Sequence, residues 1–165
     1  ALAPHIADYA SMASLPEALG DGYIARRVVV VNAGEPIRGS DGELLLEPGT
    51  LNEEIHFSAR PRANGPEEVG TVVLLRWSKR SVKTYPRGIV SYALTCDVLV
   101  VDARRRVVVA RKTIEGSEVP DHDAYVSGYT PEGLKASLMQ LQIWGLVGEV
   151  PAADISLYIK SLPRR

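Results

Sequence analysis

Hydrophobic residues alternate with small or polar ones along the middle of the chain. In the segment 89–100 every even-numbered position is apolar, whereas most odd-numbered positions between 91 and 97 are small or polar. A period of two over this length predicts a half-buried antiparallel strand. Residues 71–85 alternate as well, and the turn at 102–105 leads into a valine-rich segment at 106–114. Together these segments predict a three-stranded meander.

Two earlier segments predict further strands. Residues 23–32 (YIARRVVVVN) are rich in β-branched side chains and largely unbroken by polar residues. This pattern is typical of a strand that is covered on both faces or lies at the centre of a sheet. The stretch 44–57 is ambiguous, and its core indicates a short strand at 53–59.

Helical spacing appears towards both ends of the chain. Residues 4–13 have a modest helical pattern that Pro16 ends. Thr130 and Pro131 form a helix start signal, as N-cap and first helical residue. The apolar stripe that follows this start consists of Leu134, Leu138, Leu141 and Trp144. A last helix is expected from Pro151, with an apolar face of Ile155, Tyr158, Ile159 and Leu162.

These elements predict the α+β class, because strands cluster in the middle and helices lie at the ends. We expect a mainly antiparallel sheet of about four or five strands, with two C-terminal helices packed on one face. Residues 1–165 are interpreted as one globular domain, which also fits a fragment of a larger chain. A hairpin around VDARRR that is packed by helices resembles small accessory domains of bacterial envelope proteins. This resemblance rests on architecture alone, and nothing functional carries over from it.

Composition excludes several classes of function. The net charge of −1 gives no basic excess, so we expect no nucleic acid as partner. The longest apolar runs are far shorter than the roughly 20 residues of a membrane-spanning helix, and the opening residues lack the pattern of a signal peptide. Gly34, Gly39 and Gly42 do not form a nucleotide-binding loop, and we predict no cofactor.

Cys96 is the only cysteine, so the chain cannot form an internal disulfide. It lies on the apolar register of its strand beside Leu94 and Val98. A reactive thiol needs exposure and a basic partner. We therefore expect a buried structural thiol.

One short segment carries candidate metal chemistry. Asp121, His122 and Asp123 are consecutive in a loop that begins after Pro120. Neighbouring side chains on an extended backbone point in different directions, so a metal or acid–base site needs help from a distant residue, with His56 as the first choice. The alternative interpretation is a solvated loop whose carboxylates cap turns.

The most concentrated positive segment is 76–83 (RWSKRSVK). Alternation places Arg76 and Arg80 on the face opposite Trp77 and Lys79. One interpretation is an edge strand whose positive side chains prevent aggregation. The other is a binding patch for an anion or a protein, with Trp77 as an anchor.

Two functions from different classes remain open. The first is a non-catalytic accessory domain that binds another protein through Arg76, Trp77, Lys79, Arg80 and the loops at one end of the sheet. It predicts that these four side chains are exposed. The second is a small metal-dependent hydrolase that uses the 121–123 loop. The first is favoured because the chain carries no recognised catalytic motif, and the sequence leaves the cellular compartment open.

Overall fold

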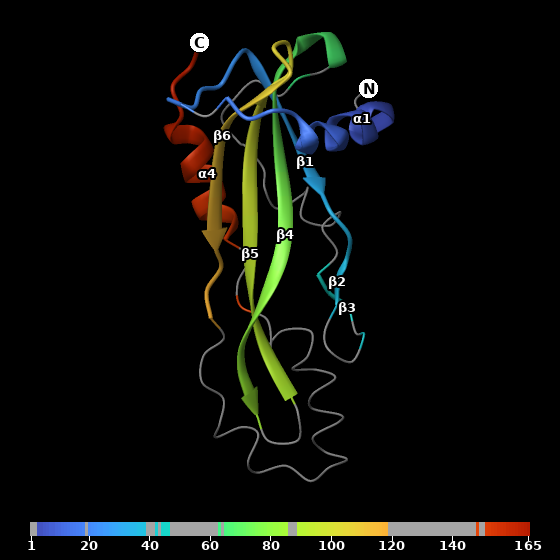
Figure 1. Ribbon diagram of the computed structural model, residues 1–165, viewed down its shortest axis with the longest axis vertical. Helices are drawn as coiled ribbons and strands as arrows, with labels where there is room; N and C mark the ends of the chain where they lie inside the picture. The colour runs from blue at the N-terminus through green and yellow to red at the C-terminus, as the bar shows by residue number, and fades with distance from the viewer. Residues whose placement is uncertain are drawn as a thin grey trace.

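The computed structural model describes residues 3–18, 20–38, 42, 44–46, 63, 65–85, 89–118, 148 and 151–165. A four-stranded sheet runs along the length of the molecule, and a two-stranded sheet lies beside it (Figure 1). The helices and strands are α1 (Ile6–Ser11), β1 (Arg27–Ala33), β2 (Ile37–Arg38), β3 (Leu44–Leu46), β4 (Val69–Tyr85), β5 (Ile89–Asp102), β6 (Val107–Glu115) and α4 (Ala152–Ser161). Short 3-10 turns occupy Ala3–His5, Met12–Ser14 and Pro66–Glu68.

The order of the main sheet is β1-β4-β5-β6. The predicted meander is confirmed, because β4, β5 and β6 pair in antiparallel fashion. The expectation of a mainly antiparallel sheet holds only in part, since β1 and β4 are parallel and the sheet is mixed. β4 begins beside the start of β1, where Arg27 pairs with Val69, and the two strands run in the same direction from there. In the described part of the chain β1 is an edge strand of this sheet, not its centre.

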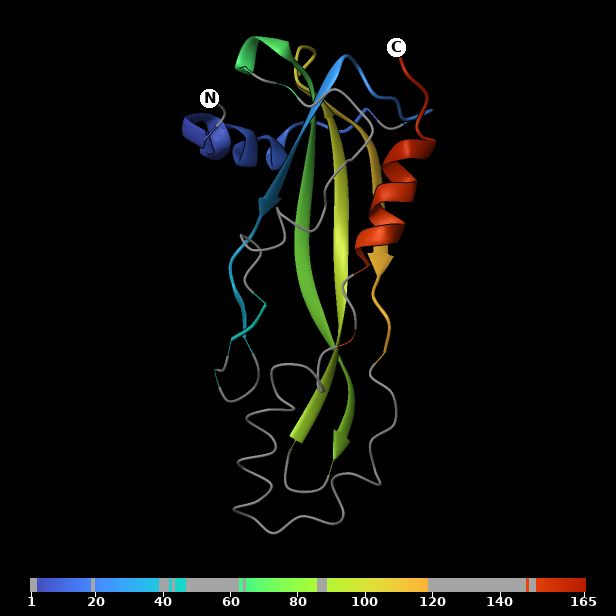
Figure 2. The same ribbon diagram turned by 180° about the vertical axis from the view of Figure 1, so that it is seen from behind.

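Both faces of the sheet are covered near its upper end in Figure 1. On one face, Ile155 and Ile159 of α4 pack against buried residues of β4, β5 and β6 (Figure 2). On the other face, Tyr9 of α1 belongs to a second core with Val29 and Val31 of β1 and alternate residues of β4 and β5. β1 contributes to both cores, as the prediction of a strand covered on both faces requires.

The expectation of two C-terminal helices on one face is met only in part. α4 is the C-terminal helix that the structure describes, and the N-terminal helix α1 covers the opposite face. Sequence patterning predicted both helices. It did not show that both faces of the sheet are apolar, so that each face needs a covering helix. The helix predicted after Thr130 and the strand predicted at 53–59 lie outside the described residues.

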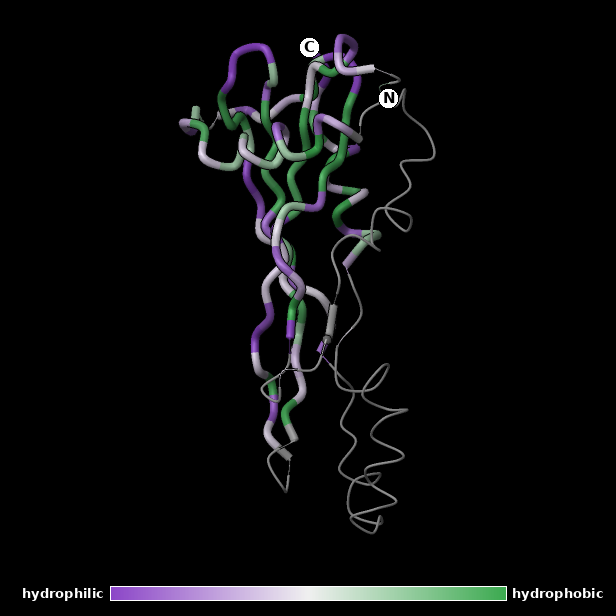
Figure 3. Tube along the Cα trace, turned by 90° about the vertical axis from the view of Figure 1, so that its right-hand side faces the viewer, coloured by the Kyte–Doolittle hydropathy of each residue, from purple (hydrophilic) through white to green (hydrophobic). Residues whose placement is uncertain are grey.

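β4 and β5 continue well beyond their neighbours. Pairing of β4 with β1 ends at Arg76, and pairing of β5 with β6 begins only at Thr95. Beyond these points, residues 79–85 and 89–94 form a two-stranded segment, which we call the hairpin extension. The remainder of the four-stranded sheet is called the sheet body. Figure 3 shows hydrophobic positions concentrated in the sheet body and alternating with hydrophilic ones along the extension.

The end of the sheet body opposite the extension is fixed by a buried polar network. The Tyr23 hydroxyl donates to Oδ2 of Asp102 at 2.6 Å, while Oδ1 of Asp102 accepts the main-chain N–H groups of Arg104 and Arg105 at 3.0 Å each. Burial by itself raises the pKa of Asp102, but these hydrogen bonds outweigh it and the pKa lies below its ordinary value. The network holds the β5–β6 turn against the segment that leads into β1.

Candidate interaction surface

Trp77 is buried, with 8% of its surface exposed. It lies on the register of β4 that faces α4, in the same core as Leu75 and Cys96. Its indole N–H donates to Oδ1 of Asn32 at 3.0 Å. The expected exposure of Trp77 is therefore wrong, because the end of β1 supplies a polar partner that allows the indole to be buried in full.

Arg76 lies on the opposite register and is partly exposed. Its guanidinium is 3.3 Å from Oδ2 of Asp97 on β5. The same carboxylate accepts hydrogen bonds from Arg111 at 3.0 Å and from the Thr113 hydroxyl at 2.6 Å, both on β6. Three neighbouring strands thus meet at a single carboxylate.

These partners stabilise the ionised form of Asp97. The hydrogen bond from Thr113 lowers the pKa of Asp97 most, burial acts in the opposite direction, and Arg111 and Arg76 lower it further. Asp97 therefore remains a carboxylate well into the acidic range. Sequence reasoning placed Asp97 on the polar register of its strand but did not assign it a role, since its cationic partners come from two other strands.

Arg80 is the next charged residue along this register of β4. It lies 3.2 Å from Oε1 of Glu118 and 3.9 Å from Oε2 of Glu115, and all three side chains are at least half exposed. The charges of both signs on this side of the sheet form one surface, which we call the charged face. It consists of Arg76, Arg80, Asp97, Arg111, Glu115 and Glu118.

Lys79 lies on the other side of β4. Its ammonium group is 4.5 Å from the centre of the Tyr92 ring, and it donates to the main-chain oxygen of Arg38 in β2. The residue is nevertheless exposed. The structure therefore places Arg76 and Arg80 on the charged face, Lys79 on the reverse side and Trp77 in the core.

The turn at Arg104–Arg106 projects from the far end of the sheet body, and all three of its arginines are exposed. It is separate from the basic segment of β4. The turn follows Asp102, which pairs with Thr71 near the start of β4, whereas the basic segment begins at Arg76 and continues towards the other end of that strand.

The candidate metal ligands Asp121, His122, Asp123 and His56 lie outside the described residues. Among the residues that the structure does describe, no three His, Cys, Asp or Glu side chains gather closely enough to hold a metal ion. Cys96 is fully buried, and burial together with the charge of Asp97 raises the pKa of its thiol to about 12. The prediction of a buried structural thiol is confirmed.

Comparisons with known proteins add little to this description. No protein-family model matches the chain, and no curated protein matches it. A hypothetical protein from Chlamydia trachomatis, CT253, whose structure is known at 1.65 Å resolution, is similar over 85% of this chain and 99% of its own, with 16% identity and a TM-score of 0.33. A likeness at this level supports no inference about fold or activity. In the described part of the chain no helix is long and apolar enough to cross a membrane.

Proposed function

We propose that this chain is a non-catalytic accessory domain that binds another protein through the charged face and Lys79. The observation that carries the proposal is the position of Lys79 and Arg80. Both are exposed on the hairpin extension, beyond the last residues of β4 and β5 that pair with β1 and β6. Trp77 supports this surface from inside the sheet body and is not itself a contact residue.

The ion pairs of the charged face are suited to exchange with a partner. Their side chains are between about a quarter and two thirds exposed, from 28% for Asp97 to 66% for Glu115. Exposed ion pairs contribute roughly 0–1 kcal/mol each to the free energy of folding. A partner with complementary charges can therefore replace one member of a pair at little cost to the fold.

The mixture of charges favours a protein over a nucleic acid. Arg76, Arg80 and Arg111 alternate with Asp97, Glu115 and Glu118, so the surface has no excess of positive charge that would attract a phosphate backbone. A protein surface carries both signs and can match such a pattern. Binding of this kind weakens with salt, since charged groups at the rim of an interface are screened.

Site-specific photocrosslinking tests the proposal. The crosslinking residue p-benzoylphenylalanine is placed at Ser78, which is exposed between Arg76 and Arg80 on the same register. The control position is Arg104 in the exposed turn at the other end of the sheet. The full chain is irradiated in cells that naturally contain it.

We expect a discrete crosslinked product of one protein from position 78 but not from position 104. Its yield should fall when the same experiment is repeated in extracts at high salt. Failure to form a product at position 78, or identical products from both positions, would contradict the proposal.

A further inference from the structure

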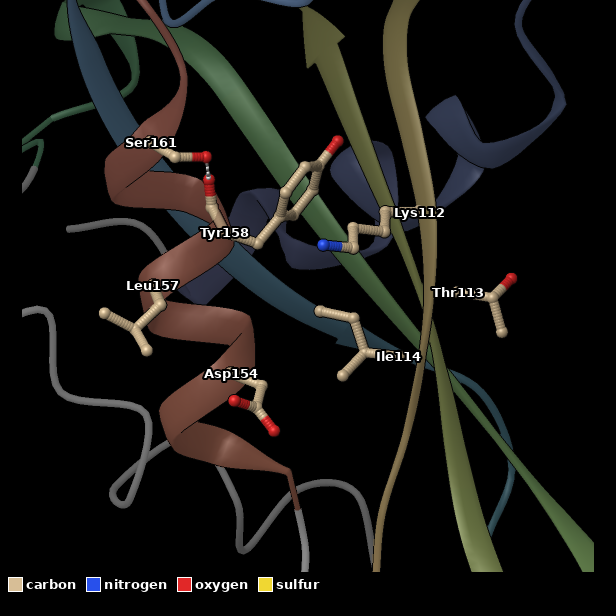
Figure 4. Close-up of a pocket in the computed structure, with 7 residues that line it drawn as sticks. All are labelled: Lys112, Thr113, Ile114, Asp154, Leu157, Tyr158 and Ser161. Carbon is tan, nitrogen blue, oxygen red and sulfur yellow. Dashed lines mark hydrogen bonds between the residues drawn. The ribbon is translucent and has the colours of Figure 1, made fainter.

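A groove of about 470 Å³ runs between α4 and β6 (Figure 4). Ile114 and the ring of Tyr158 form its inner part, and Leu157 contributes an apolar side chain that is 65% exposed. Lys112 from β6 and Asp154 from α4 also line it. Figure 4 shows Lys112 and Ile114 pointing towards α4, while the side chain of Thr113 points away from it.

The main chain of β6 forms the other wall of this groove. β6 is the last strand of its sheet. Gly116 donates its N–H to the Leu94 oxygen of β5 at 2.7 Å. Because main-chain groups alternate in direction along a strand, Thr113 and Glu115 direct their N–H and C=O groups away from β5.

At its beginning, the same edge of β6 already pairs with a short segment of the chain around Glu17. Val108 donates to the Pro16 oxygen at 3.0 Å and accepts from the Ala18 N–H at 2.8 Å, and Glu17 pairs with Val108 in parallel. In the described residues this pairing stops at Val108, and no other strand lies on the outer edge of β6. Within the described ranges, the second half of this edge thus has no strand beside it.

We propose that an extended segment of a partner protein adds to the outer edge of β6 at 111–115 and inserts its alternate side chains into the groove. Addition of an extended peptide to an exposed sheet edge is a recurrent mode of binding, in which main-chain hydrogen bonds supply affinity and pockets for alternate side chains supply specificity. The groove lies on the α4 side of β6, whereas Arg111 and Glu115 of the same strand belong to the charged face. The inference rests on the groove and the edge of β6, so it does not depend on the proposed function.

The charged residues of the groove determine which side chains the bound segment carries. Lys112, whose ammonium group is 4.9 Å from the centre of the Tyr158 ring, lies at one end, and Asp154 lies at the other (Figure 4). Directly opposed side chains of paired strands contact each other. The segment therefore places an acidic residue opposite Lys112 and an apolar residue opposite Ile114, two positions apart, and the carboxylate of Asp154 disfavours a second acidic residue beyond them.

Selection from a phage-displayed library of random nine-residue peptides tests this inference, with the full chain as bait. Selected peptides are then synthesised and titrated by fluorescence anisotropy. We expect enrichment of peptides that carry an acidic and an apolar residue two positions apart. If no peptides of this kind are enriched, the inference is wrong.

Substitutions at Thr113 separate the main chain from the side chain. Thr113→Pro removes the outward N–H, and proline is tolerated where an edge strand faces solvent. Thr113→Val keeps the N–H but loses the hydrogen bond to Asp97, which Thr113→Pro loses as well. We expect Thr113→Pro to weaken peptide binding by about tenfold or more and Thr113→Val by less than about twofold. Equal affinities of the two variants would contradict strand addition.

Charge reversal at Lys112 tests the inference even if the Thr113→Pro variant does not fold. Lys112 is exposed on β6, so Lys112→Glu is compatible with the fold. This variant should select peptides with a basic residue in place of the acidic one. Arg106→Glu, the same charge change in the exposed turn before β6, should leave the selection unchanged. If Lys112→Glu selects the same peptides as the natural chain, the groove does not determine the sequence of the bound segment, and the inference is wrong.

Discussion

The sheet body and the hairpin extension share the strands β4 and β5 but differ in how far their residues are buried. Along one register of β4, Val72 and Leu74 are fully buried in the core that contains Tyr9 of α1. On the same register Arg76, at the end of the sheet body, and Arg80, in the extension, are charged and partly exposed. β5 shows the same change from Leu99 to Asp97. In the described part of the chain, the change from apolar to charged residues on a constant register therefore marks where the core beneath α1 ends.

The largest expected effect contrasts one substitution in the two regions of β4. Val73 is fully buried in the sheet body, whereas Val82 in the extension is partly buried and lies at a register shift. Val73→Ala should lower the free energy of unfolding by roughly 2 kcal/mol, through lost burial and the cavity that remains. Val82→Ala should lower it by less than about 1 kcal/mol. Urea unfolding measures both, and equal losses would mean that the extension is packed as tightly as the sheet body.

The second effect concerns the polar network at the far end of the sheet body. Tyr23→Phe removes the hydroxyl that donates to Asp102 and leaves part of a buried carboxylate without its donor. We expect a loss of about 1 kcal/mol or more in the free energy of unfolding, since unsatisfied buried polar groups are costly. Denaturant titration of both proteins at neutral pH provides the measurement. A variant as stable as the natural protein would show that this network does not fix the end of the sheet.

A third, smaller effect depends on pH and arises on the charged face. The folded-state pKa of Asp97 lies below its ordinary value of about 3.9, so its contribution to stability is present above that pH and disappears as the pH falls through the folded-state pKa. Thr113→Val removes the hydrogen bond that lowers this pKa most. The free energy of unfolding should therefore fall less steeply below about pH 4 in Thr113→Val than in the natural chain. Parallel curves in urea titrations from pH 5 to pH 2 would contradict this role of Thr113.

The smallest expected effect is a null result with divalent metals. If the chain binds a protein and performs no metal chemistry, zinc, manganese and magnesium should leave the melting temperature unchanged. Differential scanning calorimetry measures this directly. A metal-dependent rise in melting temperature that His122→Ala abolishes would instead favour the hydrolase hypothesis and overturn the proposed function.

Sequence patterning predicted the elements with strong local signals. The period-two segments gave the β4–β5–β6 meander, and the apolar face of the last helix gave α4 with Ile155 and Ile159 in the core. The apolar register of β5 likewise indicated that Cys96 is buried. In each case the information lies within a single strand or helix, or in two strands joined by a short turn.

The features that patterning missed depend on partners distant in sequence. The parallel pairing of β1 with β4 depends on the path of a long connection, whose sequence pattern is ambiguous. The burial of Trp77 depends on Asn32, at the end of another strand. The charged face likewise forms because Asp97 meets arginines from two neighbouring strands.

Charge reversal with a matched control tests the central claim most directly. Lys79→Glu with Arg80→Glu changes the extension, and Arg104→Glu with Arg106→Glu makes the same total charge change in the turn at the other end of the sheet. With the photocrosslinker at position 78, the first double variant should lose crosslinking by about tenfold or more, while the second keeps it. If both variants crosslink equally well, the hairpin extension is not the contact surface and the proposed function is wrong.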